Sequence, residues 1–523
     1  MAKRMSITIL VAVLLVSILS TFVSDGPLNM KNKNMGLPGE IGNDSDKQVV
    51  AAPFYEAYSS LPNIEAPEGF DWRQFEGVTL NFLVENTINA NILTKESQEF
   101  TKVTGININI RAMDFSALSE KINMGFITKD GRYPLIYVDP YQTLNRFATN
   151  FEDLNRYNGN PNLPHIPGGL EDFFEEQVNV ESYYIDKAAV YSIPFDTTTM
   201  ILYYRKDIFE KYRESFQRDR GYDWTPGQYG FTWEKYCEIA DWIDKNVPDT
   251  EVKYGSGHMA QEHNSIFCDF SNVLAAYGGD YFKDENVGSL GIKEPHEIGV
   301  LTPNFIDALT MYKKIIQSSS SKSLNWDWYD TAQAFKNGEI AMMPNWDENS
   351  SSIENPSTSK VAGKVGYSIL PYGPERSASI YGGSGIGINK YASEQEKQAA
   401  WLFIVWATSP QTQLFVLKHS EGGGIPPRKS VYEDKDIKNV IAGNQGSNSK
   451  YRAMPELPAV LDAWKKENAY YRPKIGNFYY VEQIIIKNLH QMIRDDINVE
   501  NVAKSIHDEI KALSSNYTNS DGT

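Results

Sequence analysis

The feature that most constrains the fold is a strand–helix–strand pattern within residues 78–110. The stretch VTLNFLV predicts a strand, the next segment places apolar residues at helical spacing, and ININI alternates as a second strand. Gly105 stands where a helix would end in a left-handed cap. Two strands joined by one helix within about 35 residues form a βαβ unit, which requires a parallel strand pair. The sequence therefore predicts an α/β fold.

The same alternation of strands and helices continues along the chain. PLIYVDP predicts a strand with Asp139 at its carboxyl end, where open parallel sheets bind ligands, and AAVYSIPF and TMILYYR predict two more. Thr232 is the expected N-cap of one later helix, and Ser393 with Glu396 predicts a capping box on another. The C-terminal region predicts two final helices.

Composition and charge exclude several classes of partner. The chain has 50 Lys and Arg against 67 Asp and Glu, a net charge of −17, so nucleic acid is not an expected partner. Two cysteines and seven histidines are too few for a disulfide scaffold or a zinc ribbon. Cys237 and Cys268 either pair after export or stay free and buried. We expect no cofactor and no metal.

The N-terminus predicts export. MAKR is basic, and residues 7–23 carry no charge, which is typical of a signal peptide or a short membrane anchor. Since no clean small-residue cleavage site precedes Ser24, both alternatives stay open for residues 1–23. Residues 24–75 are polar and rich in glycine and proline, so they predict a flexible tether. We expect the folded part to be extracytoplasmic, at the cell surface or in a periplasm. Under the anchor alternative, residues 7–23 would hold it in the membrane.

Two motifs that suggest other chemistry do not meet its requirements. The glycine-rich stretch SASIYGGSGIGINK, residues 377–390, fits neither a dinucleotide-binding loop, nor a nucleophile elbow, nor a P-loop. HMAQEH places His258 and His263 five residues apart, and the zinc peptidase motifs need a different spacing. Asp327 and Asp330, in NWDWYD, have solvated or helix-capping roles as their default interpretation.

A set of segments in order resembles one family. VTLNFLVENTINANILTKESQEFTKVTGININI, AVYSIPFDTTTMILYYRKDIFEKY, AQAFKNGEIAMMPNW and EGGGIPPRKSVY, with the glycine-rich stretch between the last two, resemble the extracellular solute-binding proteins of sugar-type ABC importers. This is family 1, which resembles the maltose-binding and multiple-sugar-binding proteins. The resemblance covers about residues 78–513, and its specificity lies in the order of many short motifs.

The resemblance implies a fold of two α/β lobes, each a sheet flanked by helices, with a ligand cleft between them. Lobe one would hold residues 76–195 and 378–435, lobe two residues 196–377 and 436–513, and residues 514–523 would form a tail. The chain would cross between lobes near residues 194–198 and 372–381.

The implied function is to capture a sugar or oligosaccharide by hinge closure and deliver it to the permease subunits of an importer. The protein would be a monomer and not an enzyme. Two alternatives stay open: the same fold binding a non-sugar solute such as a glycerol phosphate or a polyamine, or an extracellular carbohydrate-active enzyme. Such an enzyme would need a pair of carboxylates about 5–10 Å apart.

Ligand contacts in this family come from strand ends that face the cleft. Carried over by segment, the expected residues are Glu85, Asn86, Asp139, Tyr141, Asp196, Thr197, His263, Trp346, Asp347, Tyr381, Gly382, Gly383, Ser384 and Arg428. Several have a structural alternative: core packing for Trp346, helix capping for Asp139 and an ion pair for Arg428. With four acids and one Arg, this set favours a neutral or cationic ligand over a phosphate.

Overall fold

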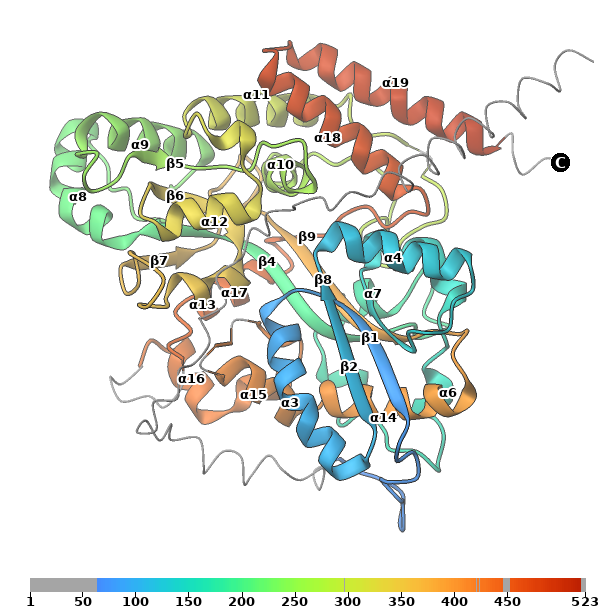
Figure 1. The fold of residues 1–523 in the computed structure, drawn as a ribbon. Helices are drawn as coiled ribbons and strands as arrows, with labels where there is room; N and C mark the ends of the chain where they lie inside the picture. Colours follow the sequence, from blue (N-terminus) through green and yellow to red (C-terminus); the bar gives the residue numbers. More distant parts are fainter. Residues whose placement is uncertain (1–63, 296, 420, 423, 445–451, 519–523) are drawn as a thin grey trace, which may run out of the picture. The chain divides into compact units, whose positions relative to one another are not determined.

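The structure, a computed structural model, describes residues 64–518 apart from 296, 420, 423 and 445–451 (Figure 1). The chain divides after residue 57 into two units, and every described residue belongs to the second. The expected signal or anchor at residues 1–23, most of the tether and the end of the tail lie outside the described residues. Among the described residues, no helix is long and apolar enough to cross a membrane.

The predicted strand–helix–strand unit is confirmed. β1 (Thr79–Glu85) is followed by α3 (Ile88–Thr104) and β2 (Asn107–Met113). β1 and β2 pair in parallel from Thr79 opposite Asn107 to Glu85 opposite Met113. Gly105 caps α3 at φ 70°, a left-handed conformation that glycine adopts without a steric penalty. Local sequence signals therefore suffice to specify this unit.

The strands run in the order β2-β1-β3-β8-β4-β6-β5, with β7 paired to β4 and β9 to β8. The bounds of the remaining strands are β3 Leu135–Val138, β4 Ile193–Arg205, β5 Tyr254–Ser256, β6 Ile340–Trp346, β7 Val365–Ser368, β8 Ser379–Ile388 and β9 Ala469–Tyr470. β1 is parallel to β2 and β3, whereas β8 is antiparallel to both β3 and β4. The sheet is therefore mixed, and the predicted parallel pairs form one part of it.

β4 joins the two halves of this strand order, because it pairs with β8 on one side and with β6 on the other. The sequence predicted two strands here, but residues 193–205 form one continuous strand. Its first half pairs with β8, from Ile193 to Thr199, and its second half pairs with β6, from Met200 to Tyr204. The glycine-rich stretch is itself the antiparallel partner β8, in which Gly382 lies opposite Thr198. The expected first crossing, near residues 194–198, thus lies inside β4.

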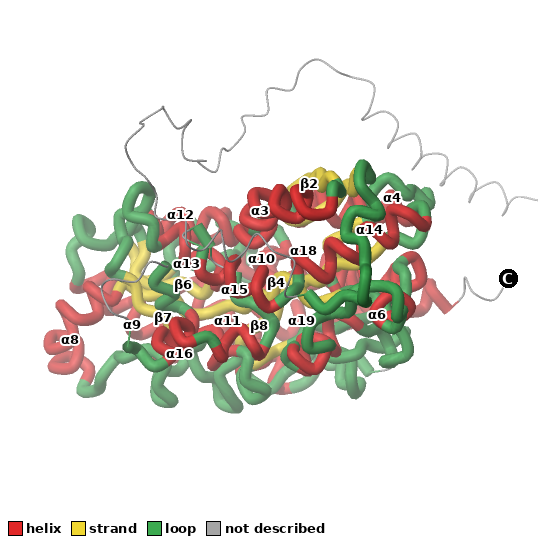
Figure 2. Tube along the Cα trace, turned by 90° about the horizontal axis from the view of Figure 1, so that it is seen from below, coloured by secondary structure: helices red, strands yellow, loops and turns green. Residues whose placement is uncertain are grey.

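Helices cover both faces of these strands, as Figures 1 and 2 show. α7, α14 and α17 contact β4 or β8, while α10 and α12 contact β8 and β6. Their bounds, with those of the other helices, are α4 Phe115–Ile127, α5 Asn145–Phe147, α6 Asn155–Asn158, α7 Glu175–Ser182, α8 Lys206–Arg220, α9 Trp233–Asn246, α10 Asn264–Ala276, α11 Pro303–Gln317, α12 Trp328–Lys336, α13 Ser350–Ile353, α14 Glu394–Ala407, α15 Pro410–Lys418, α16 Lys435–Ile441, α17 Leu457–Ala463, α18 Phe478–Arg494 and α19 Val499–Thr518.

The helix caps read from the sequence are confirmed. Thr232 accepts a hydrogen bond from the Lys235 N–H at the start of α9, and Ser393 and Glu396 form the capping box of α14. Asp327 caps α12, its default interpretation. Such caps satisfy backbone donors that the first turn of a helix leaves free.

The described residues form three apolar clusters, and the two largest both take residues from β4 and β8. The first core, built mainly on β1, α3 and α14, includes Phe82, Phe100 and Trp401. It already contains Ile64, so packing begins within the predicted tether. The second core, built mainly on α8 to α11 and α18, includes Trp233. Two cores around linking strands are the arrangement expected of a two-lobe α/β protein.

Cys237 and Cys268 are both buried and free, so of the two alternatives the disulfide does not form. Burial raises the pKa of the Cys237 thiol to about 11, which makes it a poor nucleophile.

Candidate functional site

A cavity of about 70 Å³ lies where strand ends meet the middle of β8. It is lined by residues that follow β1, β3 and β6, residues at the starts of α4, α10 and α12, and a residue after β9. These are Glu85, Thr87, Phe115, Tyr137, Asp139, Thr198, Asn264, Trp328, Tyr329, Trp346, Glu348, Asn349, Gly382, Gly383, Ser384 and Arg472. We call this group the cleft site. Strand ends of α/β sheets are where such proteins place their ligands.

Two partly buried carboxylates enter the cleft site from opposite ends of the strand order. Glu85 ends β1, and Glu348 is the second residue after the end of β6. Burial, with the charges of Asp196 and Asp139, raises the pKa of Glu85 to about 8. Burial and the charges of Asp196 and Glu85 hold the pKa of Glu348 well above its usual value. The Oε2 atom of Glu348 is buried and, among the described residues, has no hydrogen-bond partner. An unpaired buried acceptor costs free energy unless something donates to it.

Asp196 lies beneath these carboxylates and is fully hydrogen-bonded. Its Oδ2 accepts from Thr87 Oγ1 at 2.8 Å and from the Tyr137 hydroxyl at 3.1 Å, and its Oδ1 accepts from Asn89 Nδ2 at 2.6 Å. Burial raises the pKa of Asp196, while these bonds oppose the rise. Asp196 therefore fixes Thr87 and Tyr137, both of which line the cavity.

Arg472 brings a cation to the other end of the cleft site. It is only 4% exposed, and its guanidinium lies 4.0 Å above the centre of the Tyr141 ring. Its nearest ion-pair contact is Asp139 Oδ2 at 3.9 Å, and its buried Nε has no partner among the described residues. The Arg472 guanidinium is thus held in place by stacking and keeps donor capacity for a bound molecule.

Four aromatic side chains also line the cleft site. The Trp328 and Trp346 rings lie 6.5 Å apart at 72°, and Phe115 meets Trp328 edge-on at 6.5 Å and 79°. Tyr329 lies 6.0 Å from Trp328. Rings placed around a polar cavity offer flat apolar faces beside hydrogen-bonding groups, which suits a solute with both kinds of surface.

A model of the bacterial extracellular solute-binding protein family matches residues 97–443. The chain belongs to this family. The resemblance drawn from the order of the sequence motifs is therefore confirmed.

Known relatives of this solute-binding protein cover it to different extents. The erythritol/L-threitol-binding protein of Mycolicibacterium smegmatis is 22% identical over 79% of this chain and 83% of its own length. A probable amino-acid ABC transporter periplasmic-binding protein of Sinorhizobium fredii is 28% identical over 36% of this chain and 41% of its own length. A probable ABC transporter-binding protein of Deinococcus radiodurans matches over 54% of its length, so the chain spans about half of these last two relatives.

Solved structures of two-lobe binding proteins share the fold. Maltose-bound MalE3 of T. maritima superposes with a TM-score of 0.68 at 25% identity, over 84% of this chain and 100% of that one. A ribitol complex from Agrobacterium radiobacter gives a TM-score of 0.66 at 23% identity, over 84% and 99%. A D-mannitol complex from Agrobacterium vitis gives 0.64 at 19%, over 85% and 99%.

The residues predicted from sequence divide into two groups in this solute-binding protein. Those that line the cavity are Glu85, Asp139, Trp346, Gly382, Gly383 and Ser384. Asp139 also takes its structural alternative, because its Oδ1 accepts from the Tyr141 and Gln142 N–H groups at 2.8 and 2.7 Å. The helix-capping role and a cleft position are therefore compatible.

The other predicted residues lie beside or away from the cavity. Tyr141 stacks beneath Arg472, and Tyr381 donates to Glu181. Thr197 donates to the Ile425 carbonyl, and Asp347 accepts from the Thr199 N–H at 2.7 Å.

Three further predicted residues, like Asp196 described above, do not line the cavity and have partners of their own. Asn86 accepts from Asn91 at 3.2 Å, and His263 caps α10 with its ring 4.7 Å from Trp328. Arg428 pairs with Asp172 at 2.7 Å, its structural alternative.

Sequence reasoning missed ten of the lining residues. They are Thr87, Phe115, Tyr137, Thr198, Asn264, Trp328, Tyr329, Glu348, Asn349 and Arg472. For Trp328 a signal existed, because Asp327 marks a helix start beside two aromatic residues. Arg472 carries no local signal, since it follows the two-residue strand β9.

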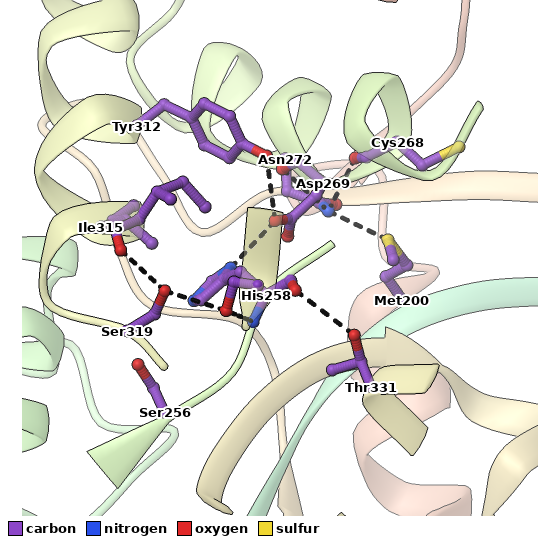
Figure 3. Close-up of polar contacts among 12 residues, drawn as sticks. Met200, Ser256, His258, Cys268, Asp269, Asn272, Tyr312, Ile315, Ser319 and Thr331 are labelled. Atoms are coloured by element: carbon purple, nitrogen blue, oxygen red, sulfur yellow. Dashed lines mark hydrogen bonds and ion pairs between the residues drawn. The ribbon is translucent and has the colours of Figure 1, made fainter. Parts of the chain in front are cut away.

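A second buried polar group, shown in Figure 3, contrasts with the cleft site. His258 Nδ1 lies 2.9 Å from Asp269 Oδ2, which also accepts from the Tyr312 hydroxyl at 3.2 Å. His258 Nε2 lies 3.0 Å from the Tyr236 hydroxyl. We call these four residues the His258 network; each is at most 1% exposed and none lines the cleft site. Across the described residues, no group of three or more His, Cys, Asp or Glu is arranged to hold a metal ion.

Proposed function

We propose that this protein is the extracytoplasmic solute-binding component of an ABC importer and captures a small sugar or polyol in the cleft site. The observation that carries the proposal is the lining of one cavity by unpaired carboxylate and guanidinium atoms together with several aromatic rings. Hydroxyl groups would satisfy the polar atoms, and the rings would cover the apolar faces of a sugar.

The size of the cavity favours a single sugar unit or a linear polyol. At about 70 Å³ it is well below the roughly 300–1,000 Å³ of sites for drug-sized ligands. The names of similar proteins include binders of erythritol, ribitol and D-mannitol, which fit this size, and also a binder of the disaccharide maltose. We therefore favour this ligand class over the oligosaccharide that the sequence also allowed.

Hinge closure is the proposed mechanism. Glu85 and Asp139 follow strands at one end of the strand order, while Trp346 and Glu348 follow a strand beyond β4. A ligand that contacts both sets stabilises the closed arrangement of the lobes over the open one. The proposed lobes are residues 76–195 with 378–435 and residues 196–377 with 436–513. Closure would present the loaded protein, as a monomer, to the permease.

A thermal-shift panel on the full chain tests this function. We expect at least one sugar or polyol among hexoses, pentitols, hexitols and tetritols to raise the melting temperature, because a ligand that binds the folded state stabilises it. A panel with no shift, together with no heat on calorimetric titration, would remove the sugar assignment. Turnover of an oligosaccharide would replace it with an enzymatic function, which the family and the similar structures do not suggest.

A further inference from the structure

We propose that the ligand carries a protonated amine beside its hydroxyl groups, as amino sugars and amino polyols do, and that its ammonium group binds between Glu85 and Glu348. This rests on the proposed function and narrows the class of solute. It follows from four features of the cleft site: the carboxylate pair, the surrounding charges, the place of Arg472 and the aromatic rings.

The carboxylate pair faces one small cavity without a cation between its members. Glu85 and Glu348 both line the 70 Å³ space, and Glu348 Oε2 has no partner among the described residues. An ammonium group has three donors and a positive charge, so it satisfies two carboxylates at once. A hydroxyl group also donates, but it carries no positive charge to balance two ionised carboxylates.

The charges around the pair are mostly negative. Asp196, Asp139 and Asp114 act on Glu85, and Asp196 and Asp347 act on Glu348. Against them, the cation that acts on Glu85 is Arg472. Together with burial, these neighbours raise the pKa of both carboxyl groups, so an ammonium ligand would take the place of protons that the empty site retains.

Arg472 is positioned for a different part of the ligand. Stacking on Tyr141 at 4.0 Å and the ion pair with Asp139 at 3.9 Å hold its guanidinium beside Asp139. This side chain is more than nine-tenths buried, lines the cavity and has an unpaired Nε. It is an independent sign of a ligand, and its N–H groups would donate to hydroxyl oxygens.

The aromatic rings favour a cation as well as a sugar. Phe115, Trp328 and Trp346 follow one another edge-to-face at 6.5 Å, all on the cavity lining. Ring faces attract ammonium groups most strongly where water is excluded, and Trp is the best ring for this. A metal ion is a poorer occupant, because no suitable group of three ligands occurs among the described residues.

Calorimetric titration of the full chain with matched pairs tests the inference. The pairs are D-glucosamine with D-glucose, D-galactosamine with D-galactose, and 1-amino-1-deoxy-D-sorbitol with D-sorbitol, with N-acetyl-D-glucosamine as an uncharged amide. We expect the amine of at least one pair to bind ten times more tightly than its neutral partner, and the amide to lose that gain. Equal or tighter binding of the neutral sugars would overturn the inference and leave the proposed function standing. Absence of binding by every member would overturn both.

Isosteric variants locate the ammonium group. Glu85→Gln and Glu348→Gln keep the shape and remove the charge, so each should reduce the amine-to-neutral affinity ratio to below threefold. The control is Glu214→Gln, an exposed residue of α8, which should leave the ratio at its wild-type value. A ratio that persists in both cleft variants, or a calcium chloride titration that binds as tightly as the amine, would contradict the proposed placement.

Discussion

The cleft site and the His258 network are both groups of polar side chains with buried atoms, and in each some atoms lack a partner among the described residues, Asp269 Oδ1 being one. They differ in that the cleft site lines a cavity and the His258 network does not. In the His258 network, Asp269 Oδ2 accepts from His258 and Tyr312, and His258 also contacts Tyr236. In the cleft site, Glu348 Oε2 and Arg472 Nε have no partner within the described residues, and both side chains line a cavity.

This difference separates polar groups that hold the fold from polar groups that await a ligand. Side chains that bond one another away from any cavity contribute to stability and specify one packing, whereas unpaired groups that line a cavity cost stability until a solute completes them. Substitutions in the His258 network should therefore change stability without changing affinity. Substitutions of the cleft-site side chains that face the ligand should lower affinity by more than they lower stability.

The largest effect is expected from Asp269→Ala. It leaves the buried His258 ring and the Tyr312 hydroxyl without their shared acceptor, so the free energy of unfolding should fall by about 3 kcal/mol or more. Chemical denaturation measures this change. Tyr312→Phe removes one donor from the same acceptor and should cost about 1 kcal/mol. An unchanged denaturation midpoint for Asp269→Ala would contradict the structural role of the network.

Adjacent glycines of β8 both line the cavity, but an added Cβ would meet buried side chains that hold the fold at Gly383 and a ring of the cleft site at Gly382. A Cβ at Gly383 would lie 2.4 Å from Glu181 Oε1 and 2.7 Å from Tyr381, both buried, so Gly383→Ala should cost about 1–3 kcal/mol. A Cβ at Gly382 would lie 2.8 Å from Trp346 Cζ3, and Trp346 is only partly buried.

For Gly382→Ala we expect the smaller loss of stability and at least tenfold weaker ligand binding, since the Trp346 ring must move. Calorimetry paired with denaturation gives both quantities for each variant. Losses that are equal in affinity and stability at Gly382 would count against a ligand contact there.

The smallest effect is a pH dependence that belongs to the cleft site. The pKa of Glu85 is raised from 4.5 to about 8 by burial and by Asp196 and Asp139, while Asp114 adds to the rise and Arg472 opposes it. Folded protein therefore holds a proton on Glu85 that unfolded protein has lost, and stability should fall as the pH rises from about 5 to 8.

Glu85→Gln removes this titration. The variant should melt about 1–3 °C above the wild type at pH 8, and the gap should narrow toward pH 5. Melting curves across this range provide the measurement. A gap that is constant with pH would show that Glu85 does not titrate as described.

Much of the fold could be predicted from the sequence because its signals are local. Gly105, Thr232 and the Ser393–Glu396 box act within one turn of helix, and each is where the sequence placed it. The continuity of β4 and the antiparallel position of β8 could not be predicted, because they depend on pairing between residues nearly 200 positions apart.

Lining residues could be predicted where a strand end or the glycine-rich stretch of β8 identifies them, as for Gly382, Gly383 and Ser384. Glu85, Asp139 and Trp346 end or follow strands and line the cavity. Along β4, Thr198 lines the cavity, whereas the predicted Thr197 bonds the Ile425 carbonyl, because successive side chains of a strand point to opposite faces. Arg472 reaches the site only through the parallel pairing of β9 with β8, which no local pattern reveals.

The most direct test of the cleft site is a calorimetric comparison of Arg472→Met with Tyr312→Phe, using the panel sugar that most raises the melting temperature. The wild type should bind one molecule per chain. Arg472→Met should weaken binding at least tenfold, because it removes the buried donors that face the cavity, and Tyr312→Phe should bind within twofold of the wild type. Unchanged affinity in Arg472→Met, or a loss of affinity confined to Tyr312→Phe, would contradict the division between a ligand site and a structural network.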